Sequence, residues 1–152
     1  MIVAPHTSNV DFLVGLAARS ILKLDTKYLA KKELFRFPFG PLFYSLGGYP
    51  VDRSKHTNMV DKVIEIFNSH QRFSICITPE GTRKYSPQWK TGFHKIAIKG
   101  NLPIVMVAFD YATKTVFAEP PFYATENMEA DIEKIKSYYR QFKGKNPENG
   151  IK

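Results

Sequence analysis

Short apolar runs of strand length alternate along this chain with segments whose apolar residues recur at helical spacing. The runs predicted as strands cover residues 1–4, 27–30, 73–78, 103–111 and 115–118, and helical spacing covers residues 11–24, 59–68, 92–99 and 128–142. Such alternation favours an α/β fold in which helices cover a layered sheet. We therefore predict a mixed, largely parallel sheet flanked by helices.

The length of the chain and the lack of a repeat or linker in its sequence indicate one domain. Its 152 residues suffice for a substantial core, and no repeat or linker divides them, so a single domain is predicted over residues 1–143. Residues 144–152 are rich in Gly, Asn, Lys and Pro and are predicted to form a flexible tail. The single Cys76 cannot form an internal disulfide, and its apolar surroundings predict a small buried hydrophobe rather than a nucleophile.

The charge of the chain constrains its partners. The formal net charge is +8 at pH 7, which favours an anionic partner. The basic residues are spread along the sequence, unlike the concentrated block of a nucleic-acid-binding arm, so no nucleic-acid partner is expected. No apolar run approaches the ~18–20 residues that span a bilayer, and no signal peptide is recognisable. We expect a cytoplasmic protein, peripheral at the inner face of the membrane.

An aromatic stretch over residues 35–48 leaves two interpretations open. It is rich in Phe and is interrupted by prolines and glycines, which introduce sharp turns. Aromatic side chains that bracket turns can line an acyl-chain pocket or enter a lipid interface. They can equally form a compact aromatic cluster beneath a loop.

The first candidate for chemistry is the pair His6 and Asp11. Four residues separate them at the predicted junction between the first strand and the first helix, where Thr7, Ser8 and Asn9 are good helix N-caps. A His beside a carboxylate is the minimal apparatus for removing a proton from a hydroxyl near neutral pH. The junction is therefore a candidate catalytic site.

Two further segments carry residues that suit an anionic ligand. Glu80, Gly81, Thr82 and Arg83 follow a predicted strand, and such a turn can present backbone N–H groups and an Arg fork to a phosphate. An ordinary strand-end loop is the alternative. Arg53 ends a glycine-led run that begins at residue 48, and could instead pair with Asp52 or face solvent.

Together, four segments resemble the glycerolipid acyltransferase family, whose best-known members are the 1-acylglycerol-3-phosphate O-acyltransferases. The H-x-x-x-x-D block matches residues 6–11, the glycine-led block ending in Arg matches residues 48–53, E-G-T-R matches residues 80–83 letter for letter, and the P-I-V block matches residues 103–105. The resemblance extends from residue 1 to about 110. It implies a fold like that of glycerol-3-phosphate acyltransferase.

The resemblance implies a catalytic role for each member of the opening pair. His6 would act as the general base that takes a proton from an acceptor hydroxyl, which then attacks an acyl thioester directly. Asp11 would hold the His tautomer and stabilise the imidazolium. The thioester would be acyl-CoA or acyl-carrier protein, used as a co-substrate, with no cofactor and no metal.

The same resemblance implies an acceptor site. Arg53 and Arg83, together with the turn formed by Glu80, Gly81 and Thr82, would bind the phosphate of a lyso-lipid such as 1-acylglycerol 3-phosphate. Arg suits this role because its planar fork matches phosphate oxygens. Contact with the membrane surface would come from the aromatic stretch and the basic surface.

Several alternatives stay open. The second block carries Pro50 where the family more often has an apolar residue, so the acceptor could be an amino-acid-derived lyso-lipid without phosphate. The domain could also bind anionic lipid without catalysis, or bind nucleic acid through its charge. The other three histidines, His56, His70 and His94, show no metal-ligand spacing, so no zinc site is expected.

Overall fold

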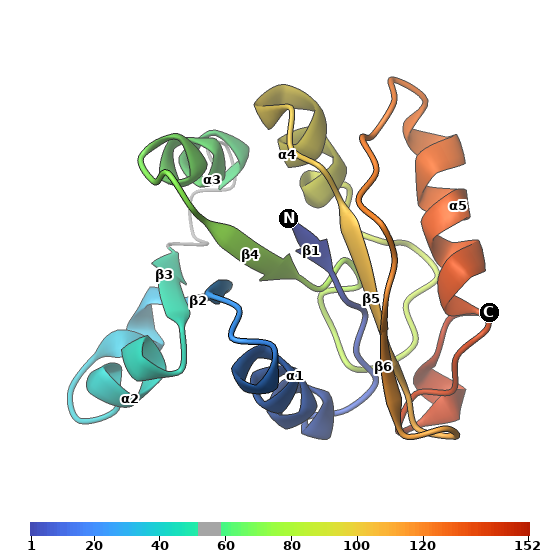
Figure 1. Ribbon diagram of the computed structural model, residues 1–152, viewed down its shortest axis with the longest axis horizontal. Helices are drawn as coiled ribbons and strands as arrows, with labels where there is room; N and C mark the ends of the chain where they lie inside the picture. Colours follow the sequence, from blue (N-terminus) through green and yellow to red (C-terminus); the bar gives the residue numbers. More distant parts are fainter. Residues whose placement is uncertain (52–58) are drawn as a thin grey trace.

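The computed structural model describes residues 1–51 and 59–152, and within them six strands form one sheet in the order β3-β2-β4-β1-β5-β6 (Figure 1). The strands are β1 (Ile2–Val3), β2 (Thr26–Lys31), β3 (Gly48–Val51), β4 (Ser74–Ile77), β5 (Val105–Asp110) and β6 (Thr115–Ala118). Neighbouring strands are parallel except β5 and β6, which are antiparallel. The prediction of a mixed, largely parallel sheet is confirmed.

Helices lie on both faces of this sheet. They are α1 (Val10–Ile21), α2 (Gly40–Ser45), α3 (Met59–Asn68), α4 (Gly92–Gly100) and α5 (Met128–Tyr139), with the 3-10 helices η1 (Lys32–Phe35) and η3 (Pro147–Asn149). Figure 1 shows α3 and α4 on one side of the sheet and α1 and α2 on the other. Within the described ranges, no helix has the length and apolar character needed to cross a membrane.

The hydrophobic core lies between the sheet and the helices α3, α4 and α5. Its completely buried side chains are Val3, Val63, Ile75, Ile104 and Ile135. They come from β1, α3, β4, the approach to β5, and α5, so the core ties together elements that are distant in sequence. All of α1 is described by the structure, yet none of its side chains belongs to this core.

Helix α1 ends earlier than the sequence predicts, and most of its apolar side chains are exposed. The helix was expected to reach residue 24 but ends at Ile21, and Lys23 adopts a left-handed conformation with φ of 52°. The apolar side of the helix is largely exposed, with Leu13 at 61% and Ile21 at 79%. Only Asp11 is buried in this helix. The apolar residues of α1 therefore lie mostly outside the core.

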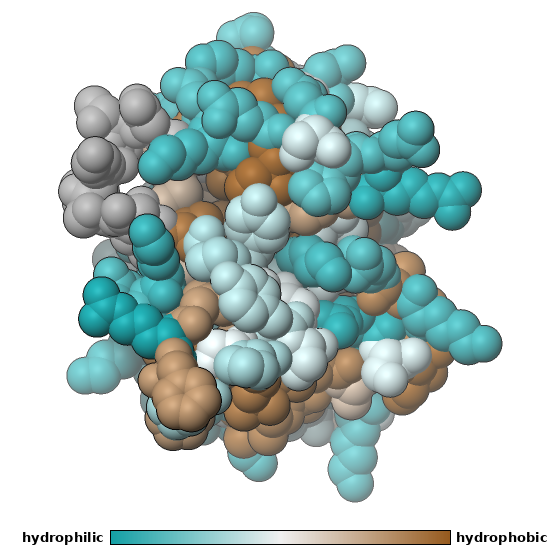
Figure 2. Space-filling view, turned by 90° about the vertical axis from the view of Figure 1, so that its left-hand side faces the viewer, coloured by the Kyte–Doolittle hydropathy of each residue, from teal (hydrophilic) through white to brown (hydrophobic). Residues whose placement is uncertain are grey.

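The aromatic stretch forms η1, a turn and α2, and its side chains divide into two groups. Phe35 packs against Phe43 and Tyr44, with ring centroids 5.9 and 4.7 Å away. Phe37 and Phe39 instead project into solvent, with exposed fractions of 93% and 63%. The aromatic cluster is therefore present, and two of the phenylalanines lie outside it. Figure 2 shows hydrophobic residues gathered along the lower edge of the molecule, at the height of α1 and α2, with hydrophilic residues beside them.

The C-terminal residues pack against the rest of the domain. Residues 144–152 were expected to be a flexible tail, but they include η3, and the guanidinium of Arg140 donates a hydrogen bond to the Lys152 carbonyl at 2.8 Å. Asn146 makes two hydrogen bonds to Thr7, close to the start of the chain. This segment therefore reaches the strand-to-helix junction that carries His6.

Candidate active site

The register of the sheet brings His6 and Glu80 together. Strands β1 and β4 are parallel neighbours with Val3 opposite Ile77, and the Ala4 N–H continues the pairing to the Ile77 carbonyl at 3.1 Å. His6 follows Val3 by three residues, and Glu80 follows Ile77 by three residues. Because the carboxyl ends of parallel strands meet at one edge of a sheet, this equal offset places the two side chains side by side.

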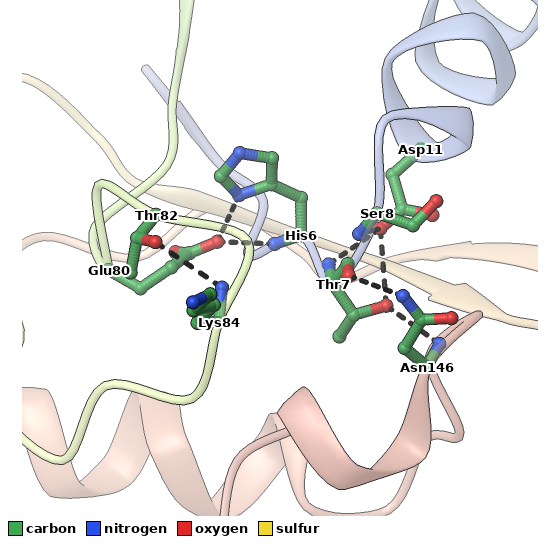
Figure 3. Close-up of polar contacts among 8 residues, drawn as sticks. All are labelled: His6, Thr7, Ser8, Asp11, Glu80, Thr82, Lys84 and Asn146. Carbon is green, nitrogen blue, oxygen red and sulfur yellow. Dashed lines mark hydrogen bonds and ion pairs between the residues drawn. The ribbon is translucent and has the colours of Figure 1, made fainter.

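The buried carboxylate of Glu80 contacts His6 twice. Its Oε1 accepts the backbone N–H of His6 at 2.5 Å and also meets Nδ1 of the imidazole ring (Figure 3). Glu80 is only 8% exposed, so water competes little for this oxygen. An ionised carboxylate only accepts hydrogen bonds, so its contact places the ring proton on Nδ1.

The second ring nitrogen of His6 is left available. Among residues 1–51 and 59–152, Nε2 of His6 has no hydrogen-bond partner, and Figure 3 shows it on the side of the ring away from Glu80. The His6 side chain is 17% exposed, so this face of the ring remains reachable. With the proton on Nδ1, the lone pair on Nε2 can accept a proton from an approaching hydroxyl.

Asp11 lies beside the same junction but interacts with other groups. Its Oδ2 accepts the backbone N–H groups of Thr7 at 2.7 Å and Ser8 at 3.0 Å, while its Oδ1 accepts the Tyr111 hydroxyl at 2.6 Å. The sequence-based expectation that Asp11 orients the His6 ring is therefore corrected. In the structure Glu80 contacts the ring, and Asp11 fixes the backbone of the junction.

The turn after β4 is tight and is closed by Lys90. Gly81 has φ of +64°, and its N–H donates to the Thr78 carbonyl at 3.2 Å. The Lys90 N–H donates to the Pro79 carbonyl at 2.8 Å, and a Cβ on Gly81 would lie 2.9 Å from Nζ of Lys90. A positive φ and this close approach both favour glycine. Lys90 is a cationic candidate that the sequence analysis did not assign.

The structure describes some of the predicted anion-binding residues but not Arg53. Arg83 is exposed, and no group in the described part of the chain pairs with its guanidinium. The Thr82 hydroxyl accepts the Lys84 N–H at 3.3 Å, which folds the turn around these residues. Arg53 lies outside the described residues. The turn thus presents an unpaired guanidinium close to the edge of the sheet that carries His6.

A small cavity of about 50 Å³ adjoins His6 and Glu80. Its other walls include Lys84, Trp89 and, from the C-terminal segment, Gly144 and Ile151. The sequence analysis assigned no functional role to residues beyond 110. The cavity therefore contains a wall contributed by a part of the chain that no motif had marked.

Tyr139 of α5 fixes the strand that leads to His6. Its hydroxyl donates to the Val3 carbonyl at 2.5 Å and accepts the Val107 N–H at 3.2 Å. Burial raises the pKa of this hydroxyl well above its ordinary value, so it stays protonated and able to donate. Helix α5 thereby stabilises β1 and β5 immediately before the candidate site.

The other described histidines have structural partners. His94 is buried, and its Nε2 lies 2.9 Å from Oδ2 of Asp131, which joins α4 to α5. His70 is exposed, with Nδ1 at 2.8 Å from the Ile66 carbonyl at the end of α3. His56 lies outside the described residues. Within the described ranges, no three His, Cys, Asp or Glu side chains are grouped as a metal site would require.

Comparison with protein families decides the class of this site. The family model described as Acyltransferase matches residues 1–110. The chain belongs to the acyltransferase family. Comparisons with curated proteins and with solved structures found no significant match. The acyltransferase match includes the whole contact between His6 and Glu80, whereas Tyr111 and the C-terminal wall of the cavity lie beyond it.

Sequence reasoning missed the role of Glu80 and the residues Tyr111 and Asn146, and the signal for each was weak or absent. For Glu80, the equal offset of two residues from two predicted buried strands was available, but only if those strands were known to be neighbours. Tyr111 and Asn146 carry no local pattern that marks them. Their positions beside Asp11 and Thr7 follow from the path of the chain through space.

Proposed function

We propose that this acyltransferase transfers a fatty acyl group from an acyl thioester, acyl-CoA or acyl-carrier protein, to the hydroxyl of a lysophospholipid such as 1-acylglycerol 3-phosphate. His6 is the general base in this proposal. The observation that supports it is the ring of His6, whose Nδ1 contacts the buried Glu80 carboxylate while Nε2 is unpaired within the described residues. A base with one nitrogen fixed and the other reachable suits direct removal of a hydroxyl proton.

The proposed reaction needs no acyl-enzyme. Nε2 of His6 removes the proton from the acceptor hydroxyl as its oxygen attacks the thioester carbonyl carbon. A C–O bond forms and the C–S bond breaks, and the departing thiolate takes the proton back from the imidazolium. Glu80 stabilises the imidazolium between these two proton transfers, which is the role of the carboxylate in serine-hydrolase triads.

The acceptor phosphate is proposed to bind at the turn after β4. Arg83 offers a guanidinium that pairs with no group in the described part of the chain, and Lys90 adds a second positive charge beside Gly81. Arg binds phosphate through its planar fork, whereas Lys acts as a point charge. Arg53 remains a proposed contributor on sequence grounds. The carboxylate of Glu80, which had been assigned to this role, instead contacts His6 and would repel a phosphate.

A phosphate-free acceptor is the alternative within the same chemistry. An amino-acid-derived lyso-lipid also presents a hydroxyl, and it would use His6 without the guanidinium of Arg83. A domain that binds anionic lipid without turnover is the non-catalytic alternative. The arrangement of His6 and Glu80 favours catalysis, because a binding domain has no need of an oriented base.

The surface around α1 and α2 supports a position on a membrane. Its exposed apolar residues, called here the apolar face, are Leu13, Ile21, Leu22, Leu24, Leu34, Phe37, Phe39, Leu42 and Tyr44. Arg19 joins the two parts of this face, because its guanidinium at the end of α1 donates to the Leu46 carbonyl after α2 at 2.8 Å.

Basic side chains border the apolar face. The exposed ones in the same segments are Lys23, Lys31, Lys32 and Arg36. Apolar side chains that enter the lipid and basic residues that meet anionic headgroups act together in interfacial proteins. We propose that the partner of this face is an anionic bilayer. Because both candidate donors are cytoplasmic, the proposed location is the inner face of the membrane.

Thiol release from a panel of acyl-CoA and acyl-carrier-protein donors, with several lyso-lipid acceptors, tests the proposed reaction. The wild type should release thiol only when donor and acceptor are both present. The variant His6→Ala should lose at least about 10²-fold in turnover, the lower range of general-base catalysis. His70→Ala, at an exposed position two residues after the end of α3, is the matched control and should retain activity. Unchanged turnover in His6→Ala would reject the mechanism, and lipid binding without thiol release would favour the non-catalytic alternative.

A further inference from the structure

The buried carboxylate of Asp11 receives hydrogen bonds from two directions. From its own junction it accepts the N–H groups of Thr7 and Ser8, and from the end of β5 it accepts the Tyr111 hydroxyl at 2.6 Å. Asp11 is only 4% exposed, so water does not replace the phenol easily. Tyr111 follows the last strand residue, Asp110, and lies just beyond the region that matches the acyltransferase family.

Asn146 binds the residue that follows His6. Its side-chain Nδ2 donates to the Thr7 carbonyl at 3.1 Å, and its backbone N–H donates to the Thr7 hydroxyl at 3.2 Å. Figure 3 shows Asn146 and Asp11 both beside Thr7, with Asn146 approaching from a different part of the chain. The backbone of Thr7 and Ser8 is therefore held from two sides. Asp11 accepts the N–H groups of both residues, and Asn146 donates to the Thr7 carbonyl.

The C-terminal segment reaches this position because β5 fixes its path. The Tyr111 N–H donates to the Lys143 carbonyl at 2.8 Å, and the Lys143 N–H donates to Oδ1 of Asp110 at 3.0 Å. Nζ of Lys145 lies 5.7 Å from the centroid of the Tyr111 ring. Tyr111 and the segment that carries Asn146 are thus parts of one local assembly.

Gly144 permits the close approach of this assembly to Thr7. A Cβ on Gly144 would lie 2.6 Å from Cγ2 and 2.7 Å from Oγ1 of Thr7. Real Cβ atoms essentially never come so close to another heavy atom. Thr7 has little freedom to move, because its N–H, carbonyl and hydroxyl are all hydrogen-bonded. A larger residue than glycine would therefore push the segment away from Thr7.

We propose that Tyr111 and Asn146 are positioning residues that clamp the junction of residues 6–9 from outside the matched acyltransferase region and so hold His6 against Glu80. The inference rests on the proposed role of His6 as general base. Neither residue contacts the reacting atoms in this proposal. Tyr111 acts through Asp11, and Asn146 acts through Thr7.

The clamp matters because the contact between His6 and Glu80 depends on the backbone of His6. Glu80 binds the His6 ring and the His6 N–H through the same oxygen. A shift of the junction would therefore disturb both contacts together. A displacement of about 1 Å at a reacting group can lower a rate by about 10²-fold.

Amide hydrogen exchange and steady-state kinetics on the full chain test the clamp. The variants are Tyr111→Phe, which removes only the hydroxyl, Asn146→Ala and Gly144→Ala. Exchange at the Thr7 and Ser8 amides should accelerate by about tenfold in each variant, since the loss of one hydrogen bond changes local opening by about that factor. This readout needs no substrate. Tyr138→Phe and Asn68→Ala are the controls, because the Tyr138 hydroxyl has no partner within the described residues and Asn68 is exposed.

The kinetic readout separates positioning from general stability. If the residues position His6, kcat should fall by about tenfold while KM and the melting temperature change little. Unchanged exchange at Thr7 and Ser8 in Tyr111→Phe and Asn146→Ala would overturn the clamp. Accelerated exchange with an unchanged kcat would also overturn the clamp, because loosening the junction would then have no effect on the function of His6. If His6→Ala retains turnover, the proposed function fails, whereas the exchange data still judge the clamp.

Discussion

Oε1 of Glu80 contacts both the ring and the backbone of His6, although 74 positions separate the two residues in the sequence. Both residues lie where their strands end. Val3 and Ile77 face each other in the sheet, and His6 and Glu80 follow them by three positions each. The proposed base and the carboxylate that contacts it are therefore positioned by the pairing of β1 with β4. The functional consequences can be tested one residue at a time.

Replacing Glu80 by Gln should impair chemistry more than binding. The amide keeps the shape of the side chain but carries no charge to stabilise the imidazolium. We expect kcat to fall by about 10²-fold with KM within about twofold of the wild type, as measured by thiol release. Glu126→Gln, at an exposed position before α5, is the control. Full activity in Glu80→Gln would show that the carboxylate is not needed at Nδ1.

Replacing Asp11 by Ala should destabilise the fold as well as the site. The variant leaves the Thr7 and Ser8 N–H groups and the Tyr111 hydroxyl without their common acceptor. The loss should be about 2–4 kcal/mol in the free energy of unfolding, as measured by urea denaturation. Asp25→Ala, whose exposed carboxylate pairs with Lys27 at the surface, should change it by less than about 0.5 kcal/mol. Equal effects of the two substitutions would contradict this role of Asp11.

Replacing Arg83 by Ala should distinguish the two classes of acceptor. If the acceptor phosphate binds at the turn after β4, the KM for a phosphorylated lyso-lipid should rise by about tenfold or more, since a charge-assisted hydrogen bond is lost. The KM for a phosphate-free acceptor should not change. Arg72→Ala is the control, because Arg72 is exposed and precedes β4 at the opposite edge of the sheet. An equal rise for both acceptors would argue against a phosphate contact.

Replacing Phe37 and Phe39 by Ser should weaken binding to vesicles that contain anionic lipid. Both side chains project into solvent, so the folded domain loses few contacts. Full burial of one large apolar side chain contributes about 1.5–3 kcal/mol, so the double variant should bind at least about tenfold more weakly in sedimentation assays. Added salt should weaken the wild type further by screening the basic residues. Tyr123→Ser, at another exposed position, is the control. An equal loss of vesicle binding in this variant would show that the apolar face is not the specific contact.

The stability of the domain should fall at alkaline pH in part because of Cys76. Cys76 as a whole is only partly buried, and the desolvation of its thiol raises the pKa from the ordinary value of 9.0 to about 12. Between these values the unfolded chain has lost the proton that the folded chain retains, so the free energy of unfolding decreases as pH rises. One such group contributes a slope of at most about 1.4 kcal/mol per pH unit.

The variant Cys76→Ala checks this contribution. Denaturation of the wild type and the variant at pH 8, 9 and 10 should give a shallower pH dependence for the variant. The tyrosines whose pKa is also raised, among them Tyr111 and Tyr139, should leave a residual slope. The thiol should also resist alkylation in the folded state at neutral pH, because the thiolate is the nucleophile. Identical slopes in both proteins would assign the alkaline loss to other groups.

Much of the fold could be predicted from local patterns. A strand was expected at residues 115–118, where β6 occurs, and α3 was expected over the residues that form it. These elements follow from apolar periodicity and turn residues, which act over a few positions. The same periodicity did not reveal that Leu13 and Ile21 are exposed, because a repeat records which side of a helix is apolar but not what covers that side.

Patterns in the sequence identified the family, most of the strands and helices but not β3 and α2, and the residue types available for acyl transfer. His6, Asp11 and Glu80 were all marked by their motifs. The tertiary structure decided their relationships: Glu80 contacts the His6 ring, Asp11 fixes the junction, and Tyr111 and Asn146 approach from beyond the matched region. Motifs record positions along a chain. Which carboxylate meets which nitrogen depends on strand pairing and on the path of the C-terminal segment, and both are set by packing between elements distant in sequence.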